Sequence, residues 1–342
     1  MDTLLFLAHT EANGALPRLA LEALSAAKSF AASLGSPSFQ AGLVGSDLSA
    51  TAARISGCGA SRLLGVSGPD FGVSRYSTDV LAAEAIVRAS GASIVVAPAT
   101  LRWNRVLGGV SQRLGGCIDT HVSTLAVQDG APAASRWFYR QRMEGSVTRT
   151  TRPWFILLES GCAPACEEAP GSVSLETISV SIPDAHRRTT VTGLRSPASD
   201  RQTIRPDAKL LFVAGAGWTK KQADGQPHPQ EAEQLILGFI DKTQASLGST
   251  KSLVDLSGEG QAVLKFMSHL NQVGQTGSTP RHPKGLATCC HGEEPHTVGW
   301  RFITERRAIN LNPSCSWAQG KADVLYVADA FVVMKTVNDL LG

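Results

Sequence analysis

Glycine-rich turns are the features of the sequence that could bind a phosphate group. Gln272-Val-Gly-Gln-Thr-Gly277 is one such turn, and Gly215-Ala-Gly217 follows the apolar run at 209–214. Backbone amides in turns of this kind, and at helix N-termini, bind the phosphates of nucleotides. Glycine and threonine also favour ordinary turns for conformational reasons, so each turn alone has a plain structural interpretation. Gly215-Ala-Gly217 also lacks the third glycine of the dinucleotide fingerprint.

Other kinds of site chemistry find little support. The sequence has no Ser-His-Asp order, no paired catalytic carboxylates and no P-loop. Its seven cysteines are odd in number, and neither Cys162-x-x-x-Cys166 nor Cys289-Cys290 has the CxxC spacing with a matching second pair that is typical of a metal site. We therefore expect no catalytic residue, no metal and no secreted disulfide framework.

Length and composition indicate a protein of two α/β lobes. A chain of 342 residues exceeds the size at which single hydrophobic cores stop growing, which is roughly 250–300 residues. Hydrophobic residues make up 43% and charged residues 18%, and a net charge of +3 is too weak for a nucleic-acid partner. The start at 1–9 lacks the positive charge of a signal peptide, and no run approaches the roughly 18 apolar residues of a membrane span. We expect a cytoplasmic protein, or one of the mitochondrial matrix if eukaryotic, without a membrane span.

Apolar runs and helical periodicities alternate along the first half of the chain. This pattern predicts a parallel sheet with helical crossovers. Predicted strands lie at 4–8, 41–45, 62–66 and 93–97, and predicted helices lie at 16–34, around 52–53 and at 78–90. From 118 to 181, short β-branched and aromatic runs at 137–140, 146–151, 154–158 and 172–181 indicate smaller mixed or antiparallel strands.

A polar stretch without apolar periodicity separates the two halves. It is rich in Arg, Ser, Thr and Pro, and we interpret residues 186–206 as a linker. The first domain is then 1–185, and the second is 207–342. The second domain begins with a buried strand at 209–214 and the glycine-rich turn, followed by a helix from about 230 to 247.

Five ordered blocks in the second domain resemble the alpha subunit family of electron-transfer flavoproteins. They span about a quarter of the chain, and the opening at 5–34 resembles that family more weakly. The blocks are Leu247-Gly-Ser-Thr-Lys-Ser-Leu-Val-Asp255 (similar to GASRAAVD), Gln272–Gly277 (similar to VGQTG), Cys290-His-Gly-Glu-Glu-Pro-His296 (in the place of SGAIQH), Ala308-Ile-Asn310 (in the place of AIN) and Ala322–Phe331 (similar to ADYGIVADLF).

The resemblance implies a fold and a cofactor. The first lobe would have the parallel-sheet fold of the adenine-nucleotide α-hydrolases, and the second would be a doubly wound lobe that binds FAD. Lys251 and His296 would lie near the pyrimidine edge of the flavin, and Thr276 near its N5 atom. Asn310 and Asp329 would hold the ribityl and AMP portion, and glycine amides would face the pyrophosphate. The full set of implied cofactor-binding residues is Thr250, Lys251, Gln275, Thr276, Gly277, Gly292, His296, Asn310 and Asp329.

Several departures from the family pattern fall at this implied site. Lys251 stands in the place of arginine, which keeps the charge but loses the planar guanidinium. Pro295 replaces glutamine, and His291, Glu293 and Glu294 replace small residues. After the first strand of the domain, Gly215-Ala-Gly217-Trp218 stands in the place of Gly-Gly-Arg-Gly.

The resemblance implies an electron carrier and not an enzyme. Such a chain pairs with a beta subunit that binds AMP, accepts electrons from flavin dehydrogenases and passes them to a quinone oxidoreductase or another acceptor. Two alternatives remain open at this point. One is an alpha-like structural or regulatory partner whose flavin site has decayed, which the substitutions at 291–295 suggest. The other is a nucleotide-dependent oxidoreductase that acts alone, which the turn at 215–217 suggests.

Overall fold

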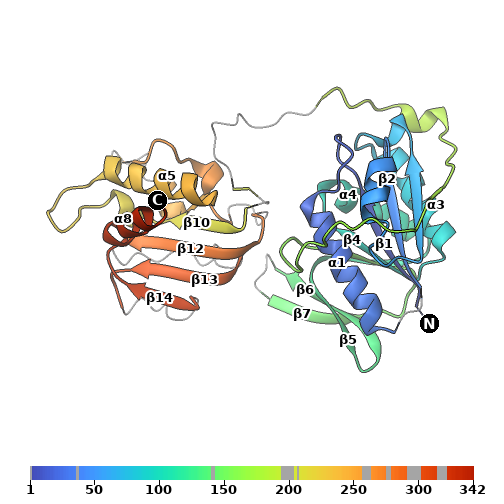
Figure 1. The fold of residues 1–342 in the computed structure, drawn as a ribbon, viewed down its shortest axis with the longest axis horizontal. Coiled ribbons are helices and arrows are strands. Elements are labelled where there is room, and N and C mark those ends of the chain that lie inside the picture. The colour runs from blue at the N-terminus through green and yellow to red at the C-terminus, as the bar shows by residue number, and fades with distance from the viewer. Residues whose placement is uncertain are drawn as a thin grey trace. The chain divides into compact units, whose positions relative to one another are not determined.

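The chain folds into two compact units, 1–195 and 196–342 (Figure 1). The computed structural model describes residues 2–35, 38–139, 143–193, 204–205, 208–255, 263–274, 279–290, 302–313 and 322–342. Each unit has its own β-sheet, which confirms the predicted two-lobe α/β fold. The domain limits proposed at 185 and 207 stay predictions.

The first unit is a nine-stranded sheet in the order β7-β6-β5-β8-β4-β1-β2-β3-β9. Its central strands are almost entirely buried and run parallel, as the apolar runs predict. These strands are β1 (Leu4–His9), β2 (Phe39–Gly45), β3 (Arg62–Ser67), β4 (Ile94–Pro98) and β8 (Trp154–Leu158). The helices are α1 (Arg18–Ser33), α2 (Ser49–Ile55), α3 (Tyr76–Ser90) and α4 (Leu101–Arg113), and short 3-10 turns are η1 (Pro69–Phe71) and η2 (Asp184–Arg187).

Side-chain alternation along the strands builds two cores, one on each face of this sheet. Leu4 and Phe6 of β1 pack with α1 and α2, whereas Leu5 and Leu7 pack with α3 and α4. A parallel sheet whose faces are both covered needs strands that are apolar on both sides, and runs such as 4–8 meet this need.

The remaining strands of the first unit extend its two edges. β5 (Cys117–Gln128), β6 (Ala131–Phe138) and β7 (Met143–Thr148) form an antiparallel meander in the region where the sequence predicts smaller mixed or antiparallel strands, although β5 lies outside the predicted runs. The three-residue β9 (Leu175–Thr177) pairs with β3. β8 lies inside the sheet between β4 and β5 and pairs in parallel with both, so this part of the sheet is mixed.

The second unit is a parallel sheet in the order β11-β10-β12-β13-β14. Its strands are β10 (Leu210–Ala214), β11 (Ser246–Ser249), β12 (His282–Cys290), β13 (Ile303–Asn310) and β14 (Val324–Val327). Its helices are α5 (Pro229–Thr243), α6 (Lys251–Asp255) and α8 (Ala330–Leu340), with turns η3 (Ala216–Thr219) and η5 (His269–Asn271). α5 and α8 pack together over one face, as Figure 1 shows.

The helix predicted at 230–247 is too long. α5 ends at Thr243 because Gln244 adopts a left-handed conformation with φ of 54°, and the chain then enters β11. No helix in the described part of either unit is long and apolar enough to cross a membrane.

Candidate functional site

The order of the strands in the second sheet identifies where a ligand would bind. The chain runs from β10 outward to β11, and then crosses to β12 on the other side of β10. Doubly wound sheets bind ligands beyond the carboxyl ends of the strands, at the point where the strand order reverses. Here that point lies between β10 and β12. We call the carboxyl ends of β10–β14, with the turns that follow them, the carboxyl edge.

The turn after β10 is closed by its own contacts. Residues 215–219 are all buried, the amide of Gly215 donates to the Thr288 carbonyl at 2.7 Å, and that of Trp218 donates to the Gly215 carbonyl at 3.3 Å. The indole Nε1 of Trp218 donates to Thr288 Oγ1 at 2.8 Å, and its ring lies 4.6 Å from that of Phe331. The turn is therefore closely packed, and the two bonded amides do not face outward.

The turn after β11 carries the only predicted cation in the described part of the site. The Thr250 amide donates to the Ala214 carbonyl at 2.9 Å, and Thr250 Oγ1 accepts from Leu253 N at 3.4 Å. Lys251 begins α6 with a side chain that is 57% exposed, and its Nζ lies 3.7 Å from Asp255 Oδ2. An exposed pair of this kind contributes little to stability, so the ammonium group is free to serve a ligand.

Two buried polar groups of the carboxyl edge have no hydrogen-bond partner among the described residues. Ser249 ends β11 and is fully buried, and its Oγ has no partner there. Asn310 ends β13 and is 1% exposed; its Oδ1 accepts from Asn312 N at 3.1 Å, while its Nδ2 has no partner in the described part. A buried polar group without a partner costs about 1–3 kcal/mol, which a bound ligand would offset.

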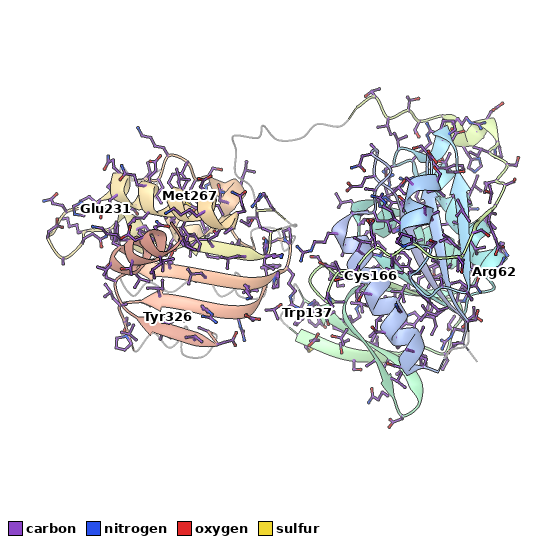
Figure 2. All side chains as sticks on the ribbon, viewed as in Figure 1. Arg62, Trp137, Cys166, Glu231, Met267 and Tyr326 are labelled. Atoms are coloured by element: carbon purple, nitrogen blue, oxygen red, sulfur yellow. The ribbon has the colours of Figure 1, made fainter. Side chains whose placement is uncertain are left out.

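Asp329, after β14, is the N-cap of α8. Its Oδ1 accepts from the amides of Phe331 at 2.7 Å and Val332 at 3.4 Å. This is the plain structural role of an aspartate between a strand and a helix. Tyr326, labelled in Figure 2, lies on the neighbouring strand β14, where its hydroxyl accepts from Arg307 Nη1 at 3.1 Å.

The carboxyl edge holds all four predicted site residues that the structure describes. Thr250 and Lys251 follow β11, Asn310 ends β13 and Asp329 follows β14. With three strand spacings between β11 and β13, Thr250 and Asn310 lie about 14 Å apart along the edge, a span suited to an elongated ligand. Ser249 was not predicted, although a polar residue that ends a buried strand next to a predicted site residue is a usable signal. The other predicted residues lie outside the described part: Gln275, Thr276, Gly277, Gly292 and His296, with the substituted positions His291, Glu293, Glu294 and Pro295.

Comparison with protein families concerns the first unit. The model of the electron transfer flavoprotein domain matches residues 4–183, more than half of the 342-residue chain. The chain belongs to the electron transfer flavoprotein family. Members of this family are electron carriers that bind flavin. No curated protein matches the chain.

The electron transfer flavoprotein domain has its own point of strand reversal, between β1 and β4. His9 at the end of β1 lies there, with Nδ1 3.2 Å from the Thr10 carbonyl and Nε2 2.9 Å from Thr100 Oγ1. Its ring meets Trp103 edge to face at 5.4 Å. Burial, with a smaller effect from the charge of Arg102, lowers the pKa of His9 to about 4. His9 is therefore neutral at pH 7, and an uncharged side chain lies at the point of strand reversal in this domain.

A buried aspartate holds the meander of the same domain to its central strands. Asp119 of β5 accepts from Arg136 Nη1 at 2.9 Å, from Nε and Nη2 of Arg149, both at 2.8 Å, and from Trp154 Nε1 at 2.9 Å. Burial raises the pKa of Asp119, but the hydrogen bonds from Arg149, Trp154 and Arg136 outweigh that effect and hold the pKa below its usual value. This network links β5, β6 and β8 and serves the fold.

Proposed function

We propose that this chain is the FAD-binding alpha subunit of a heterodimeric electron-transfer flavoprotein. Its first domain, 1–185, would contact a beta subunit that binds AMP, and its second domain, 207–342, would hold FAD. Flavin dehydrogenases would donate electrons, and a quinone oxidoreductase or another acceptor would receive them. The observation that carries this proposal is the pair of unsatisfied groups, Ser249 Oγ and Asn310 Nδ2, at the carboxyl edge of a doubly wound sheet.

The donors at this edge fit the chemistry of FAD. Bound FAD would supply the redox chemistry, accepting electrons from one protein and passing them to another. The Lys251 ammonium would favour the electron-rich cofactor by placing a positive charge beside it. Thr250 would help to orient the cofactor. Its backbone is held in place by the hydrogen bond that its amide donates to the Ala214 carbonyl. The Asn310 amide would donate to an oxygen of the cofactor, with its orientation set by the bond to Asn312 N. Gln275, Thr276, Gly277, Gly292, His296 and Asp329 complete the proposed set.

A second candidate function is that of a structural partner with a decayed flavin site. The observation that favours it is Trp218, which is fully buried in the turn after β10 and bound to Thr288. A closed turn offers fewer amides to a pyrophosphate than an open glycine loop does. The stand-alone nucleotide-dependent oxidoreductase has less support, because its glycine-rich turn is this same closed turn.

Flavin content separates these candidates. We expect the chain, co-purified with its beta partner, to be yellow and to release FAD in a one-to-one ratio, as measured by absorbance after denaturation. Lys251→Gln should lower the flavin midpoint potential. Lys209→Gln, at the opposite end of β10, is the matched control and should leave the potential unchanged. A colourless but stable complex would favour the structural partner, and equal potentials in the two variants would remove Lys251 from the site.

A further inference from the structure

Two serines on β11 have the same burial but different partners. Ser246 and Ser249 are both fully buried. Ser246 Oγ accepts from the Arg205 amide at 2.7 Å. Ser249 Oγ has no partner within the described part of the chain. A hydroxyl buried without a partner loses its bonds to water, so Ser249 destabilises the ligand-free chain relative to alanine at the same place.

The backbone around Ser249 is fixed on both sides. Its carbonyl accepts from Val273 N at 3.0 Å, and it lies in register beside Ala214 of β10. The next residue, Thr250, donates its amide to Ala214 O at 2.9 Å. Ser249 is thus held rigidly at the carboxyl edge, on the strand next to the point of strand reversal.

We propose that Ser249 is an additional flavin-contacting residue, whose hydroxyl donates a hydrogen bond to an acceptor on the flavin ring. This inference rests on the proposed function. Lys251, two residues after Ser249, is proposed to lie near the flavin end of the cofactor, and a ring oxygen or nitrogen would give the hydroxyl its missing partner. The alpha-subunit block that this segment resembles has alanine at this position, so the resemblance itself assigns no role to the Ser249 side chain.

The proposal predicts opposite outcomes for two matched variants of the full chain. Ser249→Ala should weaken FAD binding about tenfold, or about 1.4 kcal/mol, and should not lower the unfolding midpoint of the ligand-free protein. Ser246→Ala removes a satisfied hydrogen bond, so it should lower that midpoint and leave FAD affinity unchanged. FAD affinity is measured by flavin fluorescence, and stability by denaturant unfolding.

Two further measurements separate contact from a structural effect. ADP shares only the adenine end of FAD, so its affinity, measured by calorimetry, should be the same in Ser249→Ala and in the wild type. The flavin midpoint potential should be lower in Ser249→Ala, because a donor to the reduced ring is lost. Equal FAD affinity and potential in the two proteins would overturn the inference alone. Parallel losses of FAD and ADP affinity with lower ligand-free stability would also overturn it. A wild-type chain that does not bind FAD would overturn the proposed function and this inference together.

Discussion

His9 makes the stability of the first unit depend on pH in a defined direction. The neutral ring donates from Nδ1 to the Thr10 carbonyl, and Nε2 accepts from the Thr100 hydroxyl. Thr100 Oγ1 in turn accepts from Trp103 N at 3.2 Å, which caps α4. A proton on Nε2 would end the hydrogen bond that this nitrogen accepts from the Thr100 hydroxyl, and it would place a positive charge on a largely buried ring near Arg102. Protonation is therefore unfavourable in the folded state.

The sign and size of the effect follow from the lowered pKa. The pKa of His9 is about 4 in the folded chain and 6.5 in a solvated reference. Between these values the unfolded chain takes up a proton that the folded chain refuses, so stability is fully present above pH 6.5 and falls as the pH drops toward 4. The gap corresponds to about 3 kcal/mol, at 1.36 kcal/mol for each pH unit.

Hydrogen exchange of the buried amides of β1 and β4 measures this loss locally. We expect the opening free energy of these amides to fall by about 3 kcal/mol between pH 7 and pH 4, after correction for the intrinsic exchange rate. His9→Gln should lose most of this dependence. His121→Gln is a control of opposite sign, because the hydrogen bond to Glu159 raises the pKa of the half-exposed His121, and its contribution is present at low pH and lost as the pH rises. The same pH dependence in the wild type and in His9→Gln would refute the argument.

Two further substitutions test the contacts of each unit. Asp119→Ala leaves two arginines and the Trp154 indole without their shared acceptor, so unfolding of the first unit should become about 3–5 kcal/mol easier in denaturant. The exposed Glu167→Ala is its control, and a loss below 1 kcal/mol in Asp119→Ala would contradict the role assigned to the network. Asp329→Ala removes the cap of α8 and should cost about 1 kcal/mol. Asp329→Ser restores a capping oxygen, so recovery of stability without recovery of FAD affinity would separate capping from cofactor binding.

Local sequence signals predicted most of the fold and missed parts that depend on packing. The buried runs of β1 to β4 and the periodicity of α1 and α3 were sufficient to predict those elements. α4 was missed, although Trp103, Val106, Leu107 and Val110 have helical spacing, because Gly108 and Gly109 interrupt a short polar segment. The run at 154–158 was predicted as one of several smaller mixed or antiparallel strands, and its place between β4 and β5 was not predicted, although its five apolar residues are typical of a central parallel strand.

The resemblance to the alpha subunit family supplied the candidate site residues, but not their hydrogen bonding. The structure shows Thr250, Lys251, Asn310 and Asp329 at or just after the carboxyl ends of parallel strands, which lie along one edge of the sheet. Whether a buried hydroxyl or amide finds a partner depends on distant segments, so the unsatisfied groups could not be found from the sequence. The closure of the turn by Trp218 depends likewise on Thr288, which is 70 residues away in the chain.

The free energy cost of leaving Ser249 and Asn310 without partners bears on the choice between an electron carrier and a protein with a decayed flavin site. An unsatisfied buried group costs about 1–3 kcal/mol, and two of them take up a large part of the 5–15 kcal/mol by which a domain is stable. Alanine in place of Ser249, or an apolar residue in place of Asn310, would remove that cost in a protein that binds nothing there. The closed turn at Trp218 removes phosphate-binding amides from one strand only, whereas the unsatisfied groups lie on β11 and β13, on either side of it. Binding of FAD at this edge would give both groups a partner and offset that cost, as the proposed electron carrier requires.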